Sequence, residues 1–91
     1  MTTTSLDLKR KRLRFRSWHR GTKEADLVVG GFADDHLAAM SADQLDRFEA
    51  LLEAPDPDLM DWITGRRPPP ADFASDVLAL LADHIAARSR S

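Results

Sequence analysis

Apolar residues recur every three or four positions along this chain, in short segments separated by glycine, proline and helix-capping residues. This spacing places them on one side of an α-helix, and no stretch alternates polar and apolar residues for long enough to predict a strand. At 91 residues the chain is one domain with one modest core. The sequence therefore predicts an all-α fold, a compact five-helix bundle.

The first two predicted helices differ in how strongly the pattern supports them. The first extends from about Leu8 to His19 and has few apolar positions, so it should lie on the surface of the bundle. The second has apolar residues at every turn from Ala25 to Met40. Gly30 and Gly31 lie off this apolar side. Because glycine destabilises a helix interior, we expect another backbone to approach there or the helix to bend.

Capping residues define the third and fourth predicted helices. Ser41 and Gln44 have the spacing of a capping box, and the apolar face of the third helix follows them. Asp56 is the expected N-cap of a short fourth helix, with Pro57 at its first position and Gly65 as its stop. Each helix therefore has its own start signal.

The fifth predicted helix follows a proline linker at 68–70, and Asp72 is its expected N-cap. The apolar face of this helix closes the bundle. Residues 1–7 and 88–91 are expected to be flexible tails that flank a domain of residues 8–87.

Composition excludes several kinds of function. The chain has no cysteine, so disulfides, thiolate metal sites and thiol catalysis are excluded. Its apolar segments are far shorter than the roughly 20 residues of a membrane span, and no signal-peptide pattern follows the basic N-terminal part. We expect a soluble intracellular protein that does not insert into a membrane.

Residues that carry catalysis are sparse. The three histidines, His19, His36 and His84, fall on three different predicted helices, and none has a second ligand type three or four positions away. No phosphate-binding glycine loop and no nucleophile elbow is present. The sequence thus predicts neither a catalytic residue nor a metal site, and we expect a protein that is not an enzyme.

Charge is unevenly distributed along the chain. Lys9 to Lys23 contains eight basic residues and no acid, whereas Glu24 to Asp61 contains eleven acids and Arg47 as its single base. The basic segment is consistent with a nucleic-acid arm in which Phe15 and Trp18 stack on bases. It is equally consistent with a patch that docks on an acidic protein, or with a solvated helix face.

The junction of the first two predicted helices, Arg20-Gly21-Thr22-Lys23-Glu24, is the least ordinary segment. Glu24 falls in a first helical turn, where its charge is favoured, and we expect Arg20 and Glu24 to project from one corner. The alternative is a helix break with a surface ion pair worth less than about 1 kcal/mol. Gly21 is needed there either for a positive φ or for close contact, and we favour contact.

Two motifs together carry a resemblance to a known family. The order Arg20-Gly21-x-x-Glu24 and, downstream, Asp56-Pro57-Asp58-Leu59-x-x-Trp62 is similar to the succinate dehydrogenase assembly factor 2 family, called SdhE in bacteria. The resemblance extends from about Arg12 to Ile85. Two departures are Thr22, where many members carry methionine, and the three consecutive prolines of the linker.

The resemblance implies a five-helix chaperone that binds the flavoprotein subunit of succinate dehydrogenase, and in some bacteria that of fumarate reductase. It implies that the chain promotes covalent attachment of FAD to that subunit and binds no cofactor tightly itself. The implied location is the bacterial cytoplasm, or the mitochondrial matrix in a eukaryote. An antitoxin-like interaction module and a nucleic-acid binder remain as alternatives.

The resemblance also assigns the expected site. By carry-over, the motif at the partner interface consists of Arg20, Gly21 and Glu24. The expected supporting interface consists of four further residues, Arg16, His19, Asp56 and Asp58.

Overall fold

The computed structural model describes residues 4–89, and this range contains helices and turns but no strand. The helices are α1 (Ser5–Ser17), α2 (Lys23–His36), α3 (Ala42–Leu52), α4 (Asp56–Ile63) and α5 (Asp76–Ser89), with a short 3₁₀ turn η1 (Leu37–Ala39) after α2. The predicted all-α five-helix bundle is confirmed. Residues 1–3 and 90–91, the outermost parts of the two predicted tails, lie outside the described range.

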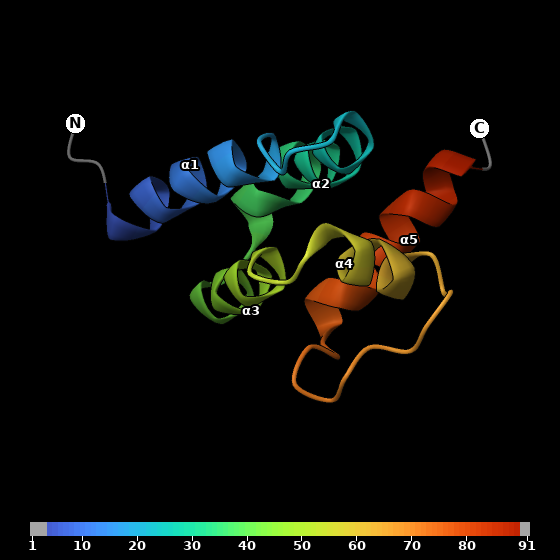
Figure 1. The fold of residues 1–91 in the computed structure, drawn as a ribbon. Helices are drawn as coiled ribbons and strands as arrows, with labels where there is room; N and C mark the ends of the chain where they lie inside the picture. The colour runs from blue at the N-terminus through green and yellow to red at the C-terminus, as the bar shows by residue number, and fades with distance from the viewer. Residues whose placement is uncertain (1–3, 90–91) are drawn as a thin grey trace.

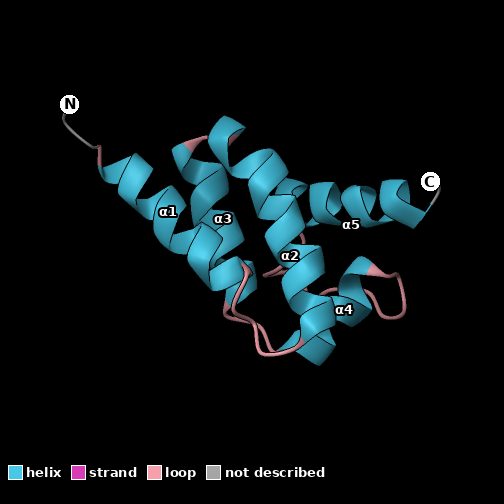
Figure 2. Cartoon of the chain, turned by 90° about the horizontal axis from the view of Figure 1, so that it is seen from above, coloured by secondary structure: helices cyan, strands magenta, loops and turns pink. Residues whose placement is uncertain are grey.

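The helices are arranged so that α1 and α5 lie on opposite flanks of the molecule (Figure 2). α1 packs against α2 and α3, whereas α5 packs against α2, α3 and α4 (Figure 1). α2 and α3 therefore occupy the middle, and their apolar sides contribute Phe32 and Phe48, among others, to the core.

The core is built from side chains that the apolar spacing placed on one side of each helix. Phe32 of α2 and Phe48 of α3 are fully buried, with their ring centroids 5.6 Å apart. Trp62 of α4 is also buried and packs against Phe73, at a centroid distance of 5.0 Å. The tryptophan thereby anchors the short helix α4 in the core.

Capping explains where two of the helices begin. Ser41 and Gln44 form the predicted capping box at α3. A second capping box, between Thr4 and Asp7, starts α1 at Ser5 rather than near Leu8. In each box a side chain accepts a hydrogen bond from an amide that has no partner in the first helical turn. The second box was not recognised in the sequence, because no apolar stripe follows it.

The prediction that Asp56 caps α4 is wrong. The N-cap is Pro55, and Asp56 is the first residue of the helix, where its carboxylate binds the guanidinium group of Arg20 instead of a helix amide. A carboxylate in the first turn still interacts favourably with the helix dipole. Gly65 follows α4 with φ of +79°, which confirms the predicted stop.

The prediction that Asp72 caps the fifth helix is also wrong. The amide of Phe73 donates to the carbonyl of Pro70, so the segment after the prolines forms a separate turn. α5 begins only at Asp76, and the hydroxyl of Ser75 accepts a hydrogen bond from the amide of Leu78. Serine thus takes the capping role that was expected of the aspartate.

Gly30 is required for a reason that differs from both expectations. A Cβ atom on Gly30 would lie 2.3 Å from the indole ring of Trp18, so a side chain, and not a backbone, approaches there. The indole nitrogen of Trp18 donates a hydrogen bond to the carboxylate of Asp34 at 3.2 Å. Asp34 lies on α2, one helical turn after Gly30. This contact presses the end of α1 against α2 and fixes where the chain enters the turn at Gly21.

Candidate partner-binding site

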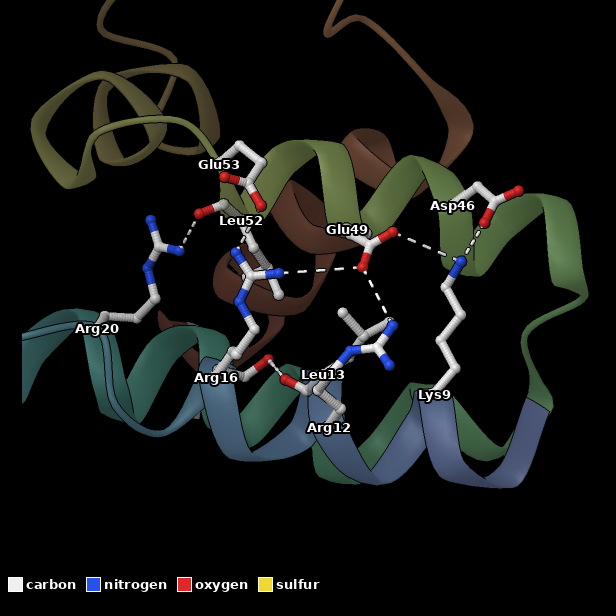
Figure 3. Close-up of polar contacts among 10 residues, drawn as sticks. Lys9, Arg12, Leu13, Arg16, Arg20, Asp46, Glu49, Leu52 and Glu53 are labelled. Atoms are coloured by element: carbon white, nitrogen blue, oxygen red, sulfur yellow. Dashed lines mark hydrogen bonds and ion pairs between the residues drawn. The ribbon is translucent and has the colours of Figure 1, made fainter. Parts of the chain in front are cut away.

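Arg20 points into the protein, and its side chain is only 9% exposed. Its guanidinium group donates to the carbonyls of Leu52 and Ala54, the second at 2.8 Å, and to the carboxylate of Asp56 at 2.8 Å. Figure 3 shows the side chain directed at the end of α3. The last carbonyls of a helix have no partner within it, so Arg20 satisfies the end of α3 and ties it to the start of α4. We call this group of four residues the Arg20 clamp.

The backbone around Arg20 is fixed from the other side by α2. The amide of Arg20 donates to the carboxylate of Asp26 at 2.6 Å. Thr22, one of the two departures from the family pattern, is the N-cap of α2, and its hydroxyl accepts from the amide of Ala25 at 3.2 Å. The turn between α1 and α2 is therefore held at both ends.

Gly21 has φ of +117°, a conformation that residues with a side chain rarely adopt. Within the described chain, no atom lies within 4 Å of the place where a Cβ would be. The structure shows the positive φ at this glycine, and the favoured contact with a partner stays a prediction. The exposed backbone leaves open space above the turn.

Glu24 lies at the outer edge of the same turn. Its carboxylate is exposed and makes no hydrogen bond or ion pair with any described residue. It borders two shallow hollows of about 310 and 350 Å³, which it separates. The first is lined further by Leu27, Val28, Ile85 and Arg88, and the second by Pro57, Met60, Asp61, Thr64 and Arg66.

The expectation that Arg20 and Glu24 both project from one corner is wrong for Arg20, which is directed inward. Gly21 and Glu24 lie at the exposed corner, together with Thr22 and Lys23, which are also exposed. The reason is the set of carbonyls at the end of α3, which bind a buried guanidinium group more strongly than water would.

The four expected supporting residues lie in different surroundings. Asp56 belongs to the Arg20 clamp, and Asp58 pairs with Arg67 at 2.6 Å. His19 is exposed, with its ring stacked on Phe15. Arg16 pairs with Glu53 of α3 at 2.7 Å. The structure thus joins Asp56 to Arg20, but it does not gather the four residues into one cluster.

Arg16 belongs to a row of ion pairs between α1 and α3 (Figure 3). We call this row the charge ladder; its pairs are Lys9 with Asp46, Arg12 with Glu49, and Arg16 with Glu53. The two members of every pair are 37 positions apart, so α1 and α3 run in the same direction. The hydrogen bond to Asp46 raises the pKa of Lys9.

The charge ladder bears on the hypothesis of nucleic-acid binding. Three of the cations of α1 are neutralised by carboxylates of α3, and a phosphate backbone lying along them would meet those carboxylates. Trp18, one of the two expected stacking groups, is packed on Gly30. Phe15 alone remains free to contact a partner.

His84 is partly buried between α5 and α2, with its ring 5.7 Å from those of Phe32 and His36. Burial lowers the pKa of its imidazole, His36 and Arg88 lower it further, and Asp35, with an oxygen 3.8 Å away, opposes them. No group of three or more potential metal ligands occurs among the described residues. No described helix is both long and apolar enough to cross a membrane.

Two residues that support or border the corner, Asp26 and Leu27, were not expected from the sequence. Asp26, which fixes the amide of Arg20, had a visible signal in its place within the first turn of a helix. Leu27 borders the first hollow and is 43% exposed. Its signal was a leucine that lies off the apolar side of α2.

The fold and this corner define a small helical bundle with an exposed turn, an exposed carboxylate and two shallow hollows. The chain belongs to the family described as the flavinator of succinate dehydrogenase, whose family profile matches residues 11–85.

Individual relatives agree with this assignment. The chain is 42% identical over 79 residues to an FAD assembly factor SdhE of Acetobacter pasteurianus, covering 87% of this chain and 72% of that protein. Two further relatives are named succinate dehydrogenase assembly factor 2, mitochondrial. The one from Aedes aegypti is 37% identical over 88% of this chain, and the one from Dictyostelium discoideum is 37% identical over 82%. The chain spans about half the length of these two relatives, 51% and 53%.

Proposed function

We propose that this chain binds the flavoprotein subunit of succinate dehydrogenase and promotes covalent attachment of FAD to it. The observation that carries this proposal is the family match over residues 11–85, which includes the whole Arg20 to Glu24 segment. The names of the relatives, an FAD assembly factor and succinate dehydrogenase assembly factors, support it. In some bacteria the flavoprotein subunit of fumarate reductase is a second partner under this proposal.

The proposed role is that of a chaperone and not of an enzyme. Joining the 8-methyl carbon of the flavin to a histidine nitrogen requires loss of a methyl proton and places negative charge on the ring. The partner supplies the FAD and the reacting groups, which need to be held in one geometry. A small bundle that binds the correctly closed partner shifts its population toward that state, to the extent of its differential affinity.

The corner defines which residues touch the partner in this proposal. Gly21 offers an accessible backbone, and Glu24 offers a carboxylate that has no partner among the described residues. The hollows that Glu24 borders receive partner side chains. Arg20 acts as a positioning residue, because its guanidinium group is already bonded within the chain. Asp56 supports it from within the clamp.

The remaining expected residues contribute from the flanks of the corner. His19 is exposed beside Arg20 and contacts the partner directly in this proposal. Arg16 and Asp58 orient α1 and α4 through their ion pairs. We propose a cytoplasmic location in a bacterium and the mitochondrial matrix in a eukaryote; the names of the two eukaryotic relatives include the word mitochondrial.

The test is co-expression of the flavoprotein subunit with and without this chain, followed by denaturing electrophoresis and in-gel flavin fluorescence. We expect strong fluorescence only when the chain is present. Equal fluorescence in both samples contradicts the proposed function. Co-purification with a toxin in place of the flavoprotein supports the antitoxin-like alternative.

A matched pair of variants tests the site. Glu24→Gln removes the carboxylate at the corner, and Asp83→Asn removes an exposed carboxylate on α5. We expect the first variant to lose flavinylation and partner binding and the second to retain both. Equal behaviour of the two variants contradicts the assignment of Glu24.

A further inference from the structure

α1 carries most of the large apolar side chains that are exposed to solvent in the described chain. Of the four large apolar residues that are exposed in the described chain, three lie on this helix: Leu6, Leu8 and Phe15, which are 37, 56 and 64% exposed. Leu8 and Phe15 lie on one side of α1 and Leu6 lies on another. Exposed apolar side chains on one helix face are a mark of an interaction surface.

Leu8, Lys11, Phe15 and His19 follow one another at intervals of three or four positions, so they lie on a single side of α1. All four are exposed, and we call them the outer stripe. The other sides of α1 are occupied. Leu13 faces the core, the cations of the charge ladder face α3, and Arg14 pairs with Asp34 of α2 at 3.4 Å.

Two residues of the outer stripe, Phe15 and His19, contact each other within the chain. The rings of Phe15 and His19 are stacked, with centroids 4.0 Å apart and planes inclined by 17°. The imidazole Nδ1 of His19 lies 2.6 Å from the carbonyl oxygen of Phe15, which fixes the second ring. A surface that is already ordered loses little conformational entropy on binding. The ring pair directly precedes Arg20, so the stripe is continuous with the corner at Gly21.

The charge of the outer stripe indicates the chemistry of its partner. Lys11 makes no ion pair with any described residue, and residues 8–23 contain no acid. Leu8 and Phe15 are seven positions apart, about 10 Å along the helix.

We propose that the outer stripe is a second docking surface for the flavoprotein subunit. It takes a segment with two apolar side chains about 10 Å apart and a carboxylate between them. This inference rests on the proposed function.

Other occupants fit less well. A second copy of this chain, related by a two-fold axis, would bring the cations of two α1 helices together. A nucleic acid needs several unpaired cations along its path, and the carboxylates of the charge ladder lie beside the stripe. A protein segment with a carboxylate meets neither obstacle.

Binding of the isolated flavoprotein subunit to the full chain tests the inference. The first variant, Phe15→Ser, removes the most exposed aromatic ring, and the second, Leu8→Ala with Lys11→Ala, removes one apolar and one cationic group. The matched control, Leu6→Ala with Arg14→Ala, makes the same kinds of change on other sides of α1. We expect each stripe variant to weaken binding at least tenfold and the control to weaken it less than threefold.

Thermal melting by circular dichroism separates binding from folding, because exposed side chains should leave the melting temperature almost unchanged. Flavoprotein binding by both stripe variants at wild-type affinity, with loss of binding by Glu24→Gln, overturns the outer stripe and leaves the proposed function intact. Failure of the wild-type chain to bind the flavoprotein overturns both. Binding of duplex DNA that is weakened by Phe15→Ser also overturns the inference, because it assigns the stripe to a nucleic acid.

Discussion

The charge ladder and the Arg20 clamp both hold α3, and they do so by opposite means. The ladder uses six side chains on the surface, such as Glu53, which is 66% exposed. The clamp uses one guanidinium group that is 9% exposed and bonded to two carbonyls and a carboxylate. Exposed ion pairs typically contribute less than about 1 kcal/mol, whereas breaking a buried one costs several times more. Burial, and not the number of ion pairs, should therefore decide which region stabilises the fold.

The two regions also differ in what they position. The ladder fixes the direction and register of α1 against α3 over about two helical turns. The clamp fixes the start of the turn that carries Gly21 and Glu24. We therefore expect changes in the ladder to alter stability first, and partner binding only through the orientation of α1. Changes in the clamp should alter stability and partner binding together.

Replacing Arg20 by alanine should destabilise the protein more than any other single change in these two regions. It leaves the carbonyls of Leu52 and Ala54 without their donor, and we expect a loss of about 3 kcal/mol in the free energy of unfolding. For a domain of this size that lowers the melting temperature by roughly 10–20 °C. The control is Arg16→Ala, which breaks a ladder pair and should cost less than about 1 kcal/mol. Equal losses from the two variants, measured by urea unfolding, would refute the comparison.

Gly21→Ala strains the turn next to the clamp and should have the second largest effect. A side chain at φ of +117° costs about 1–2 kcal/mol, whatever its size. Gly21→Arg should cost the same stability, but it should also block the partner. The control, Gly31→Ala, places a Cβ in ordinary contact at 3.8 Å inside a helix and should be neutral or stabilising. An unchanged melting temperature for Gly21→Ala would show that φ is not the constraint.

Glu49→Gln tests the ladder at its centre, where Glu49 contacts Arg12 at 3.4 Å and Lys9 at 3.5 Å. We expect a loss of less than about 1 kcal/mol at low salt. In 1 M salt, where the screening length is about 3 Å, the difference from the wild type should disappear. The cost of Arg20→Ala should persist at that concentration. A Glu49→Gln effect that does not depend on salt would mean that packing, and not charge, holds this side of α3.

Raising the pH should weaken the charge ladder but not the Arg20 clamp, and we expect this effect on stability to be the smallest of the four. The hydrogen bond to Asp46 raises the pKa of Lys9 above its ordinary value of 10.5. Its contribution is therefore complete below pH 10.5 and is lost as the pH rises through the raised pKa. The chain has three lysines and neither tyrosine nor cysteine, so few other side chains titrate there. Lys9→Arg should remove part of the alkaline loss of stability, whereas Lys11→Arg, without an ion-pair partner in the described chain, should not.

Local signals made much of the fold predictable. The apolar side of α2 and the capping box of α3 specify their helices without reference to the rest of the chain. The wrong N-cap at Asp56 has a different origin. Its carboxylate is taken by Arg20, 36 positions away, and no local pattern reveals such a partner. Likewise, the inward direction of Arg20 depends on where α3 ends in space.

The charge ladder was partly visible in the sequence. The cations at Lys9, Arg12 and Arg16 and the carboxylates at Asp46, Glu49 and Glu53 share the same intervals of three and four positions. The segregation of charge is visible in the sequence, but it is equally consistent with an external partner and with a solvated helix face. Pairing within the chain requires that the two helices lie side by side and run in the same direction, which the spacing alone does not establish.

Because Trp18 packs on Gly30 close to the corner, its intrinsic fluorescence can report on binding at that corner. The chain has two tryptophans and no tyrosine, so its near-ultraviolet emission comes from Trp18 and Trp62 alone. Trp62 is buried in the core, whereas Trp18 is half-buried two residues before Arg20 and donates to the carboxylate of Asp34. A Trp62→Phe variant would leave one fluorophore beside the proposed docking corner. Its emission maximum and its quenching by acrylamide would then follow occupancy of that corner in solution, without any attached label.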